Sequence, residues 1–481
     1  MTALPDPARP GAARSGAMSG RLTALDWWLD GGVLGPVRRL VAAIVVAVGP
    51  WIVFVATLAI ISMTSAPALG RAGLQDLRLT VTYAFCFAPM AAGPVGLAAA
   101  ELARCTREEA LDLPIYDVFR VALALSGVVS AVLALAISMF LNLAPFGAVS
   151  SYVLLSAAAA MLWVCFATLS ALRSFRVLIM AFLGGITLAI MGTVLVVRFA
   201  PSIELLLWCF AAGLIFCVAV SLNHVQKLFA PGHQTVGQAF ILLRREIWRR
   251  RMLSAGVTLA LLGIWADKWV FWLGPDGMLS AAGFRHFSRY DSVMFVAHLS
   301  MIPTFSAILL LRERELSVAL KTVQGRMQTL ASRRAVAQSI EALAQVAWTG
   351  GFRLLFVQAT IAGMLILAAP WIARGMSFDF QQFLMLRVAI GAVFFFSVAY
   401  VGSILILMCG RARHFLLVQA VFFLLNLGLS VAFITRVDVT AYPIFLSSLI
   451  TAIVAWPIAL KSIAEYDFLY MLGENESLYD A

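Results

Sequence analysis

The sequence predicts an all-α polytopic membrane protein with about 12 transmembrane helices in two six-helix lobes. Of its 481 residues, 62% are hydrophobic and 12% charged, and the mean hydropathy is +0.95. Soluble domains average about 25% charged residues, so a soluble enzyme or a disulfide scaffold is excluded. The apolar runs are continuous over about 20 residues, the length of a membrane-spanning helix. A transmembrane β-barrel would alternate polar and apolar residues instead.

Twelve apolar runs bounded by charged residues, Pro or Gly predict the individual helices. In the first half they cover about 41–64, 79–102, 118–143, 151–172, 177–197 and 202–222. In the second half they cover about 254–274, 291–311, 352–373, 385–408, 414–434 and 441–461. Because each run can cross a hydrocarbon core of about 30 Å, short connections suffice between most of them.

These runs group into an N-terminal lobe over 31–225 and a C-terminal lobe over 254–463. Residues 1–30 are rich in Pro, Ala, Gly and Arg and predict a disordered cytoplasmic extension, and residues 464–481 predict an acidic cytoplasmic tail. The six cysteines form no CxxC pair and have no His at metal-ligand spacing, so we expect apolar packing residues. We expect no cofactor and no metal.

The positive charges predict the orientation in the membrane. If the N-terminus is cytoplasmic, 24 Lys and Arg residues fall on the cytoplasmic side of the predicted spans and 7 on the other side. Short cytoplasmic loops carry such an excess of Lys and Arg. The distribution therefore predicts cytoplasmic N- and C-termini and explains the net charge of +11 without nucleic acid.

Two polar segments predict surfaces for lipid or protein. Residues 226–253 include an amphipathic basic helix with Val236, Phe240, Leu243 and Ile247 on one face, suited to an anionic leaflet. The basic residues of this helix are Arg244, Arg245, Arg249, Arg250 and Arg251. The alternative is that these charges are simply solvated and only set the orientation of the chain in the membrane. The cytoplasmic insertion 312–351 carries a helical apolar stripe and predicts a docking surface for a partner. That stripe consists of Leu316, Leu320, Val323, Met327 and Leu330.

Prolines inside the apolar runs predict broken or kinked helices, because each removes a helical hydrogen bond. They are Pro50, Pro89, Pro94, Pro303, Pro370 and Pro457. The run from Pro89 through Gly93 and Pro94 is the clearest predicted break, and Pro50 and Pro303 are further expected hinges. Transporters place sites and hinges at such breaks, whereas ordinary kinked packing is the alternative.

The seventh run contains GIWADKWVFW, from Gly263 to Trp272, with a charge pair among tryptophans. Each of Asp267 and Lys268 costs about 2.5–3.5 kcal/mol at a span centre. Since adjacent helical residues point about 100° apart, we expect the two not simply to neutralise each other. The functional interpretation is a carbohydrate path with Trp265, Trp269 and Trp272 stacking on sugar rings. The alternative is an interfacial aromatic belt with snorkelling charges.

Further polar residues are expected in or near that path: Tyr290, Asp291, Arg353, Gln358 and Asn426. Interface anchoring is the alternative for Arg353 and Gln358, and hydrogen bonding between helices is the default for Asn426. His298 is expected to be a hydrogen-bonded packing residue.

The blocks GIWADKWVFW and YDSVMFVAHLSMIP, the latter from Tyr290 to Pro303, resemble the PelG family, which exports the Pel exopolysaccharide. Weaker likeness lies at Gly49 to Trp51, Gly351 to Trp371 and Leu424 to Gly428. The resemblance implies the flippase-superfamily fold in a bacterial inner membrane and export of an N-acetylhexosamine polymer for a biofilm matrix. It also implies two partners, a cytosolic glycosyltransferase and a cyclic-di-GMP-receptor membrane protein.

Other functions are weighed against polysaccharide export. A lipid-linked oligosaccharide flippase should place cations in its central cavity, but the first and eighth spans hold no Lys or Arg. Many cation-coupled drug antiporters need a buried carboxylate in the first lobe, where only Glu101, near the cytoplasmic end of the second span, and Glu204, near the start of the sixth, are available. A scaffold that anchors a synthase is the fourth reading. No Walker, Ser-His-Asp or HExxH motif appears, so we expect a transporter and not an enzyme.

Overall fold

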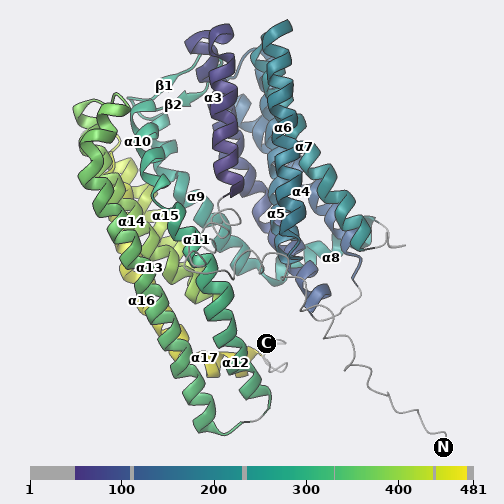
Figure 1. Ribbon diagram of the computed structural model, residues 1–481, viewed down its shortest axis with the longest axis vertical. Helices are drawn as coiled ribbons and strands as arrows, with labels where there is room; N and C mark the ends of the chain where they lie inside the picture. The colour runs from purple at the N-terminus through teal and green to yellow at the C-terminus, as the bar shows by residue number, and fades with distance from the viewer. Residues whose placement is uncertain (1–48, 109–112, 230–235, 330, 437–439, 474–481) are drawn as a thin grey trace, which may run out of the picture.

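The computed structural model describes residues 49–108, 113–229, 236–329, 331–436 and 440–473, and these are almost entirely helical (Figure 1). The first half contains α3 (Gly49–Glu108), α4 (Ile115–Leu141), α5 (Phe146–Ala171), α6 (Phe175–Phe199) and α7 (Ile203–Leu228). The helix α8 (Val236–Arg249) follows and leads directly into α9 (Arg251–Leu273).

The second half begins with an antiparallel hairpin of β1 (Met278–Leu279) and β2 (Arg285–His286) after α9. Its helices are α10 (Ser288–Leu299), α11 (Ile302–Leu310), the π-helix η2 (Leu311–Leu316), α12 (Ser317–Gln328), α13 (Arg333–Gly375), α14 (Phe380–Met408), α15 (Ala412–Ala432), α16 (Tyr442–Ala464) and α17 (Tyr466–Gly473). The hairpin defines what we call the hairpin end of the molecule, and α12 and α17 lie at the opposite end (Figure 1).

Within the described residues, eleven helical segments are long and apolar enough to cross a membrane. The first of them is part of α3, whose 60 residues would extend about 90 Å if straight. Gly70 interrupts α3 with φ 67° and ψ −174°, so two helices meet there. Counting both, the predicted architecture of about 12 spans is confirmed, although the first predicted span, 41–64, lies partly outside the described residues.

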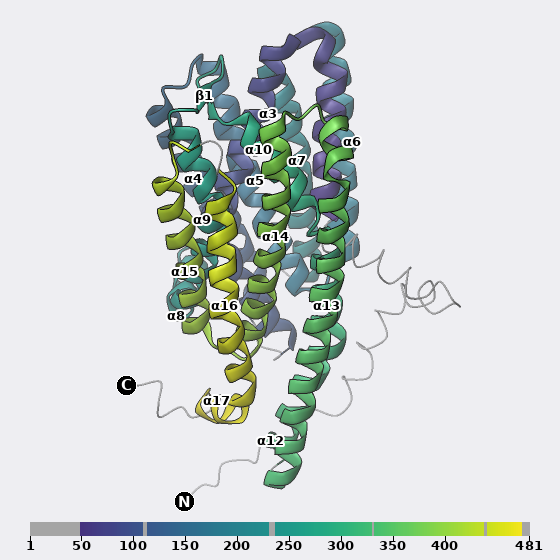
Figure 2. The same ribbon diagram turned by 90° about the vertical axis from the view of Figure 1, so that its left-hand side faces the viewer.

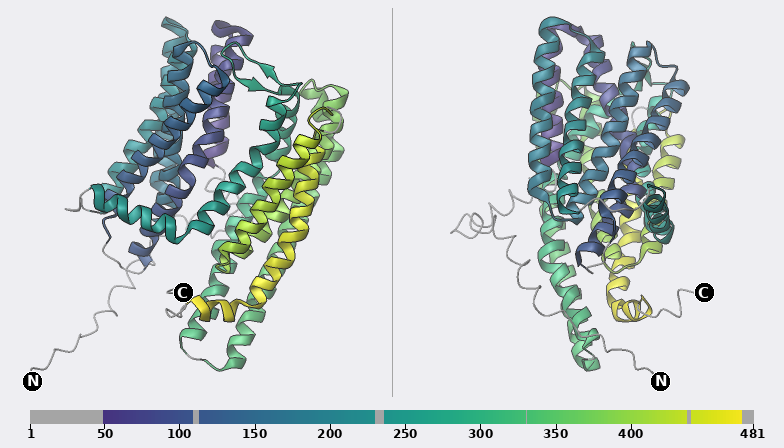
Figure 3. Two further views of the ribbon diagram at one scale, coloured as in Figure 1. Left: turned by 180° about the vertical axis from the view of Figure 1, so that it is seen from behind. Right: turned by 90° about the vertical axis from the view of Figure 1, so that its right-hand side faces the viewer.

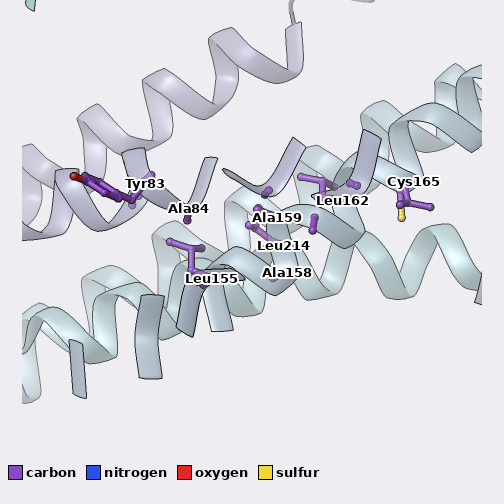
Figure 4. Packing of buried hydrophobic residues seen from close by; sticks show 14 of the residues in the cluster. Tyr83, Ala84, Leu155, Ala158, Ala159, Leu162, Cys165 and Leu214 are labelled. Carbon is purple, nitrogen blue, oxygen red and sulfur yellow. The ribbon is translucent and has the colours of Figure 1, made fainter. Parts of the chain in front are cut away.

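The first lobe consists of α3 to α7, in which α3 packs on α5, α5 on α4 and α7, and α6 on α7. Small residues make these contacts close, as Figure 4 shows for Ala84 of α3 and Ala158 and Ala159 of α5. Gly185 of α6 and Gly213 of α7 face each other so closely that a Cβ on either would overlap the other's carbonyl oxygen. Membrane helices associate through such close packing.

The second lobe consists of α9 to α17, in which α14 packs on α16, α9 on α15 and α15 on α16. In Figure 2, α12 and the first turns of α13 extend beyond the other helices. The helix α17 joins this extension, since Gln324 and Gln328 donate hydrogen bonds to the hydroxyls of Tyr466 and Tyr470 at 2.9 and 3.0 Å.

The buried core differs at the two ends of the molecule. One cluster runs from the first lobe into the hairpin end of the second, including Phe271 of α9, Phe284 near β2 and Ile390 of α14. A separate cluster, with Leu316, Val401 and Ala459, fills the opposite end of the second lobe and contains none of the described residues of the first. The lobes are therefore joined by apolar packing at the hairpin end, from which they diverge (Figure 3).

Two expected breaks have different outcomes. The helix α3 continues through Pro89, Gly93 and Pro94 without a non-helical dihedral, so the break predicted there is wrong. This stretch lies beside α9, because a Cβ on Gly93 would be in ordinary van der Waals contact with Leu261 and Val257, 3.6 Å from each. By contrast, a break does occur at Pro303, where α10 ends at Leu299 and α11 begins at Ile302. Pro50 lies at the start of α3, but its side chain lies outside the described residues.

The apolar stripe of the insertion points inward. Leu316, Val323 and Met327 are buried in the separate core of the second lobe, and Leu320 is partly buried against it. Leu330 lies outside the described residues. The expectation that Leu316, Leu320 and Met327 present a docking surface is therefore corrected, because α13 and α17 of the same chain cover this stripe.

The inter-lobe segment forms the expected helix α8, and Leu243 of its predicted apolar face packs against the first lobe. Ala239, Leu243 and Glu246 are buried against the first lobe, whereas Val236 and Phe240 are exposed. Because α8 contacts the first lobe through one narrow face, apolar side chains on its other faces, such as Val236 and Phe240, stay exposed. The arginines 244, 245, 249 and 251 are exposed.

Candidate functional site

The charge pair of the seventh span is buried on α9, which runs obliquely from α8 toward the hairpin end (Figure 3). Lys268 Nζ lies 3.2 Å from Asp267 Oδ2, and it also donates to the carbonyl oxygen of Ile264 at 3.0 Å. The expectation that the adjacent residues do not neutralise each other is wrong, because the long lysine stem folds back over one turn.

Side chains from two other helices complete the coordination of Asp267. The hydroxyl of Tyr290, on α10, donates to Asp267 Oδ2. The amide of Asn426, on α15, donates to Asp267 Oδ1 at 3.3 Å and to the carbonyl oxygen of Gly263 at 2.8 Å. Three donor groups thus hold one buried carboxylate, and α9, α10 and α15 are joined at this point.

Aromatic rings extend the cluster from α9 to the first lobe. Trp269 stacks on Phe87 of α3, with ring centroids 5.2 Å apart and planes 3° from parallel. Trp272 stacks on Tyr83 of α3 at 4.9 Å and 24°. Offset-stacked rings gain about 0.5–1.5 kcal/mol beyond the apolar area they bury. Because each pair joins one lobe to the other, these contacts hold the lobes together.

A second carboxylate fixes the tryptophan nearest the hairpin. Asp291 accepts a hydrogen bond from Trp272 Nε1 at 3.0 Å and from the backbone N–H of Phe287 at 3.1 Å. Trp265 lies against the edge of Trp272, and its own ring is 5.7 Å from Lys268 Nζ, within cation–π range. The side chains predicted from the first sequence block therefore form one connected cluster.

The hairpin between α9 and α10 docks on the first lobe by hydrogen bonds. Asp76 of α3 accepts from the backbone N–H of Ala282 at 3.2 Å, and the carbonyl oxygen of Ala282 accepts from the N–H of Ala144 at 3.2 Å. Phe284 fits between the rings of Tyr83 and Tyr152.

The second strand of the hairpin makes two further bonds to α3. The hydroxyl of Tyr83 donates to the carbonyl oxygen of Arg285 at 2.7 Å, and Gln75 is hydrogen-bonded to the buried ring of His286. Burial lowers the pKa of His286 below its usual value, and the nearby carboxylate of Asp76 opposes this shift. The hairpin is thus hydrogen-bonded to α3 next to the aromatic cluster.

Three other predicted residues lie away from this cluster. Gln358 of α13 is buried at the break between α10 and α11, where its Oε1 accepts a hydrogen bond from Thr304. Arg353 is exposed and pairs with Glu315 of η2 at 2.9 Å. Both connect α13 to neighbouring elements. His298 is hydrogen-bonded through Nδ1 to the carbonyl oxygen of Met294 at 2.7 Å, a contact typical of a packing residue.

Several residues of the site had no signal in the sequence. In the sequence, nothing distinguishes the span residues Tyr83 and Phe87 or the flanking residues Gln75 and Asp76 from their neighbours. His286 looks like part of a connecting loop. Their contacts join positions about 200 residues apart, such as the 202 residues between Tyr83 and Arg285. Only the folded arrangement of the two lobes brings them together.

Comparison with known proteins places this geometry in a family. The family model of PelG, exopolysaccharide exporter (EPS-E), matches residues 30–468. No curated protein sequence matches the chain significantly.

Solved structures of similar fold are transporters. The chain is similar to a mutant of the Vibrio cholerae MATE transporter VcmN, with TM-score 0.63 and 12% identity, covering 90% of this chain and 98% of that one. A MATE protein in the bent conformation gives TM-score 0.62 at 14% identity, over 90% and 96% of the two chains. A MOP superfamily transporter from Pyrococcus furiosus gives 0.55 at 15% identity, over 90% and 97%. At these identities the likeness concerns the fold.

Proposed function

The chain belongs to the PelG family of exopolysaccharide exporters, and from this premise we propose that the exported polymer passes between α3 and α9, along the aromatic and charged cluster of α9. The observation that carries the proposal is the pairing of Trp269 with Phe87 and of Trp272 with Tyr83 across the two lobes. Aromatic faces carry partial negative charge and attract the C–H faces of sugar rings. Asp267 and Lys268 are bound within the chain in this conformation, and they supply hydrogen-bonding groups for hydroxyl and acyl-amino substituents once the cluster opens.

In this conformation the aromatic faces cover each other, so the path is closed at the hairpin end. Passage of a polymer requires the two rings of each pair to separate and a sugar ring to take the place of one of them. The stacking energy lost between the lobes is then partly replaced by stacking on the polymer. This exchange favours movement of a chain of similar units, because each new unit meets the same faces.

We further propose that the protein is a multi-pass protein of a bacterial inner membrane, with the hairpin end on the periplasmic side and both termini cytoplasmic. The distribution of Lys and Arg supports this orientation. A cytosolic glycosyltransferase that makes an N-acetylhexosamine polymer, together with a cyclic-di-GMP-receptor membrane protein, would act at the opposite end. The extension of α12 and α13, with exposed Val318 and Trp348, offers a surface there.

Substitution of the tryptophans tests the path. We expect Trp269→Ala and Trp272→Ala each to lower secreted polymer several-fold, because each removes one ring face from the interface. Lectin staining of the cell surface, normalised to the amount of protein in membranes, measures the effect in a strain that depends on this chain. Trp371→Ala is the matched control, since Trp371 on α13 is 69% exposed and lies outside the cluster.

Wild-type secretion by both cluster variants, at normal protein levels, would show that the polymer takes another route. An equal loss in the Trp371→Ala control would point to a general effect on folding or insertion.

A further inference from the structure

A cavity of about 450 Å³ lies at the end opposite the hairpin, where α3 ends and α8 leads into α9. It is separate from the aromatic cluster and takes no part in the proposed path. Its charged lining consists of Arg104, Arg245, Arg249 and Arg250 with Glu101 and Glu246.

Positive charges outnumber negative charges in this lining. Glu101 is bound by Arg104 at 2.6 Å and by Arg250, and Glu246 is bound by Arg250 and Arg249 at 2.6 and 3.2 Å. Among the lining side chains, the three guanidinium groups of Arg104, Arg249 and Arg250 therefore share two carboxylates. Arg245 is exposed and makes no ion pair within the described part of the chain. Guanidinium groups are suited to bidentate binding of phosphate oxygens.

The same cavity has an apolar side. Leu102, Leu113 and Leu242 line it beside the arginines. On α8, Ile241 and Trp248 are exposed, at 57% and 64%. An amphipathic helix with basic and aromatic residues lies at the boundary between headgroups and acyl chains. The combination of basic and apolar lining indicates a ligand with a phosphate at one end and a hydrocarbon chain at the other.

We propose that this cavity is a specific site for the phosphate headgroup of an anionic phospholipid, with Arg245 and Arg249 as its principal ligands. The acyl chains would lie along the exposed side chains of α8. Arg250 lies at the junction of α8 with α9, and its bond to Glu101 connects that junction to α3. A headgroup bound beside Arg250 would therefore change the ion pair between Arg250 and Glu101, which links the α8–α9 junction to the first lobe.

Lipid binding by the purified full chain tests the site independently of export. Native mass spectrometry in detergent is titrated with phosphatidylglycerol, with zwitterionic phosphatidylcholine and with inorganic phosphate alone. We expect Arg245→Gln/Arg249→Gln to bind phosphatidylglycerol about tenfold more weakly than the wild type, as for the loss of charge-assisted hydrogen bonds. Arg245→Gln alone breaks no ion pair of the described residues, so a clear weakening in this variant keeps the test independent of folding.

The matched control is Arg244→Gln/Arg251→Gln, which removes the same charge from neighbouring exposed positions that do not line the cavity. This variant should bind phosphatidylglycerol nearly as the wild type does. Equal weakening in both double variants would overturn the proposal, because a general surface attraction of about 1 kcal/mol per basic residue would explain it. Equal affinity for phosphatidylcholine or for inorganic phosphate, or an acidic protein co-purifying in place of lipid, would also overturn it.

Discussion

At the scale of single residues, the central feature is a buried carboxylate with a full set of donors. Asp267 would be costly in lipid on its own, by about 2.5–3.5 kcal/mol. Lys268, Tyr290 and Asn426 all donate to it, and no side chain of this set is more than slightly exposed. Removing one charge of a buried pair generally costs more than removing both, because the remaining charge has no partner.

We therefore expect Lys268→Met to be more destabilising than the double variant Asp267→Asn/Lys268→Met. The single change leaves the Asp267 carboxylate without its cation and should cost about 3–5 kcal/mol, the usual range for breaking a buried pair. In the double variant, the asparagine side-chain oxygen still accepts the hydrogen bond from Tyr290, so most of the loss should be recovered. Fluorescence-detected thermal unfolding in one detergent compares the variants. A double variant as unstable as the single one would contradict the account.

At the scale of elements, the hairpin of β1 and β2 is a connection that also serves as a contact surface. Its two strands are only two residues long each, too few to be stable alone. Its bonds to Asp76, Tyr83 and Ala144 come from the first lobe, although the hairpin belongs to the second. The hairpin is therefore held in place by docking and should be released when the lobes separate.

Docking of the hairpin should weaken at acid pH. The pKa of His286 is below its usual value in the docked state, so the docked state binds fewer protons than the free hairpin. Docking is then complete above the usual histidine value of about 6.5, and it weakens as the pH falls through that value and through the lowered pKa. Hydrogen exchange of residues 278–286 at pH 7.5 and 5.5 measures this.

The variant His286→Gln serves as the control for this pH effect, since glutamine has no titrating group. The exchange rates of its hairpin, corrected for intrinsic pH effects, should not differ between the two pH values. The same acid-induced rise in exchange in His286→Gln would assign the effect to another group.

At the scale of the whole molecule, the two lobes share one core at the hairpin end and are separate at the other. Phe271, Phe284 and Ile390 belong to the core that continues into the first lobe, whereas Leu316 and Ala459 belong to a core of the second lobe alone. Buried apolar packing across the lobes therefore resists separation mainly at the hairpin end. A transport cycle that opens this end must therefore break both the aromatic pairs and the hairpin contacts.

A cross-link between the lobes should stop export. The backbone N–H of Ala144 donates to the carbonyl oxygen of Ala282 at 3.2 Å, so these two positions are close enough in space to be chosen for a disulfide, which needs Cα atoms about 4.4–6.8 Å apart. We expect Ala144→Cys/Ala282→Cys to secrete polymer under reducing conditions and to lose secretion on oxidation. Lectin staining before and after addition of reductant measures the change.

A cross-link within the hairpin provides the control for this experiment. Leu279 and Arg285 are register partners of the two strands, so Leu279→Cys/Arg285→Cys joins the hairpin to itself and leaves the lobes free. It should secrete polymer in both redox states. Unchanged export by the fully oxidised Ala144→Cys/Ala282→Cys protein would mean that the hairpin end does not open.

The sequence alone determined the membrane class and the number and boundaries of most spans. These follow from hydropathy because lipid requires about 20 consecutive apolar residues and helices that satisfy their own hydrogen bonds. It also indicated Asp267, Lys268 and the tryptophans, since charge is costly in a span. The breaks were less predictable: α3 passes through Pro89 and Pro94 and bends at Gly70 instead.

Only the tertiary structure decided which groups meet. Tyr290 and Asn426 reach Asp267 from positions 23 and 159 residues away, and Tyr83 and Phe87 meet the tryptophans of α9 across the two lobes. The apolar stripe at Leu316 and Met327 has a helical period whether it faces a partner or its own chain, and the folded α13 and α17 made it core. Periodicity specifies which residues share a face, whereas the packing of distant helices specifies what that face contacts.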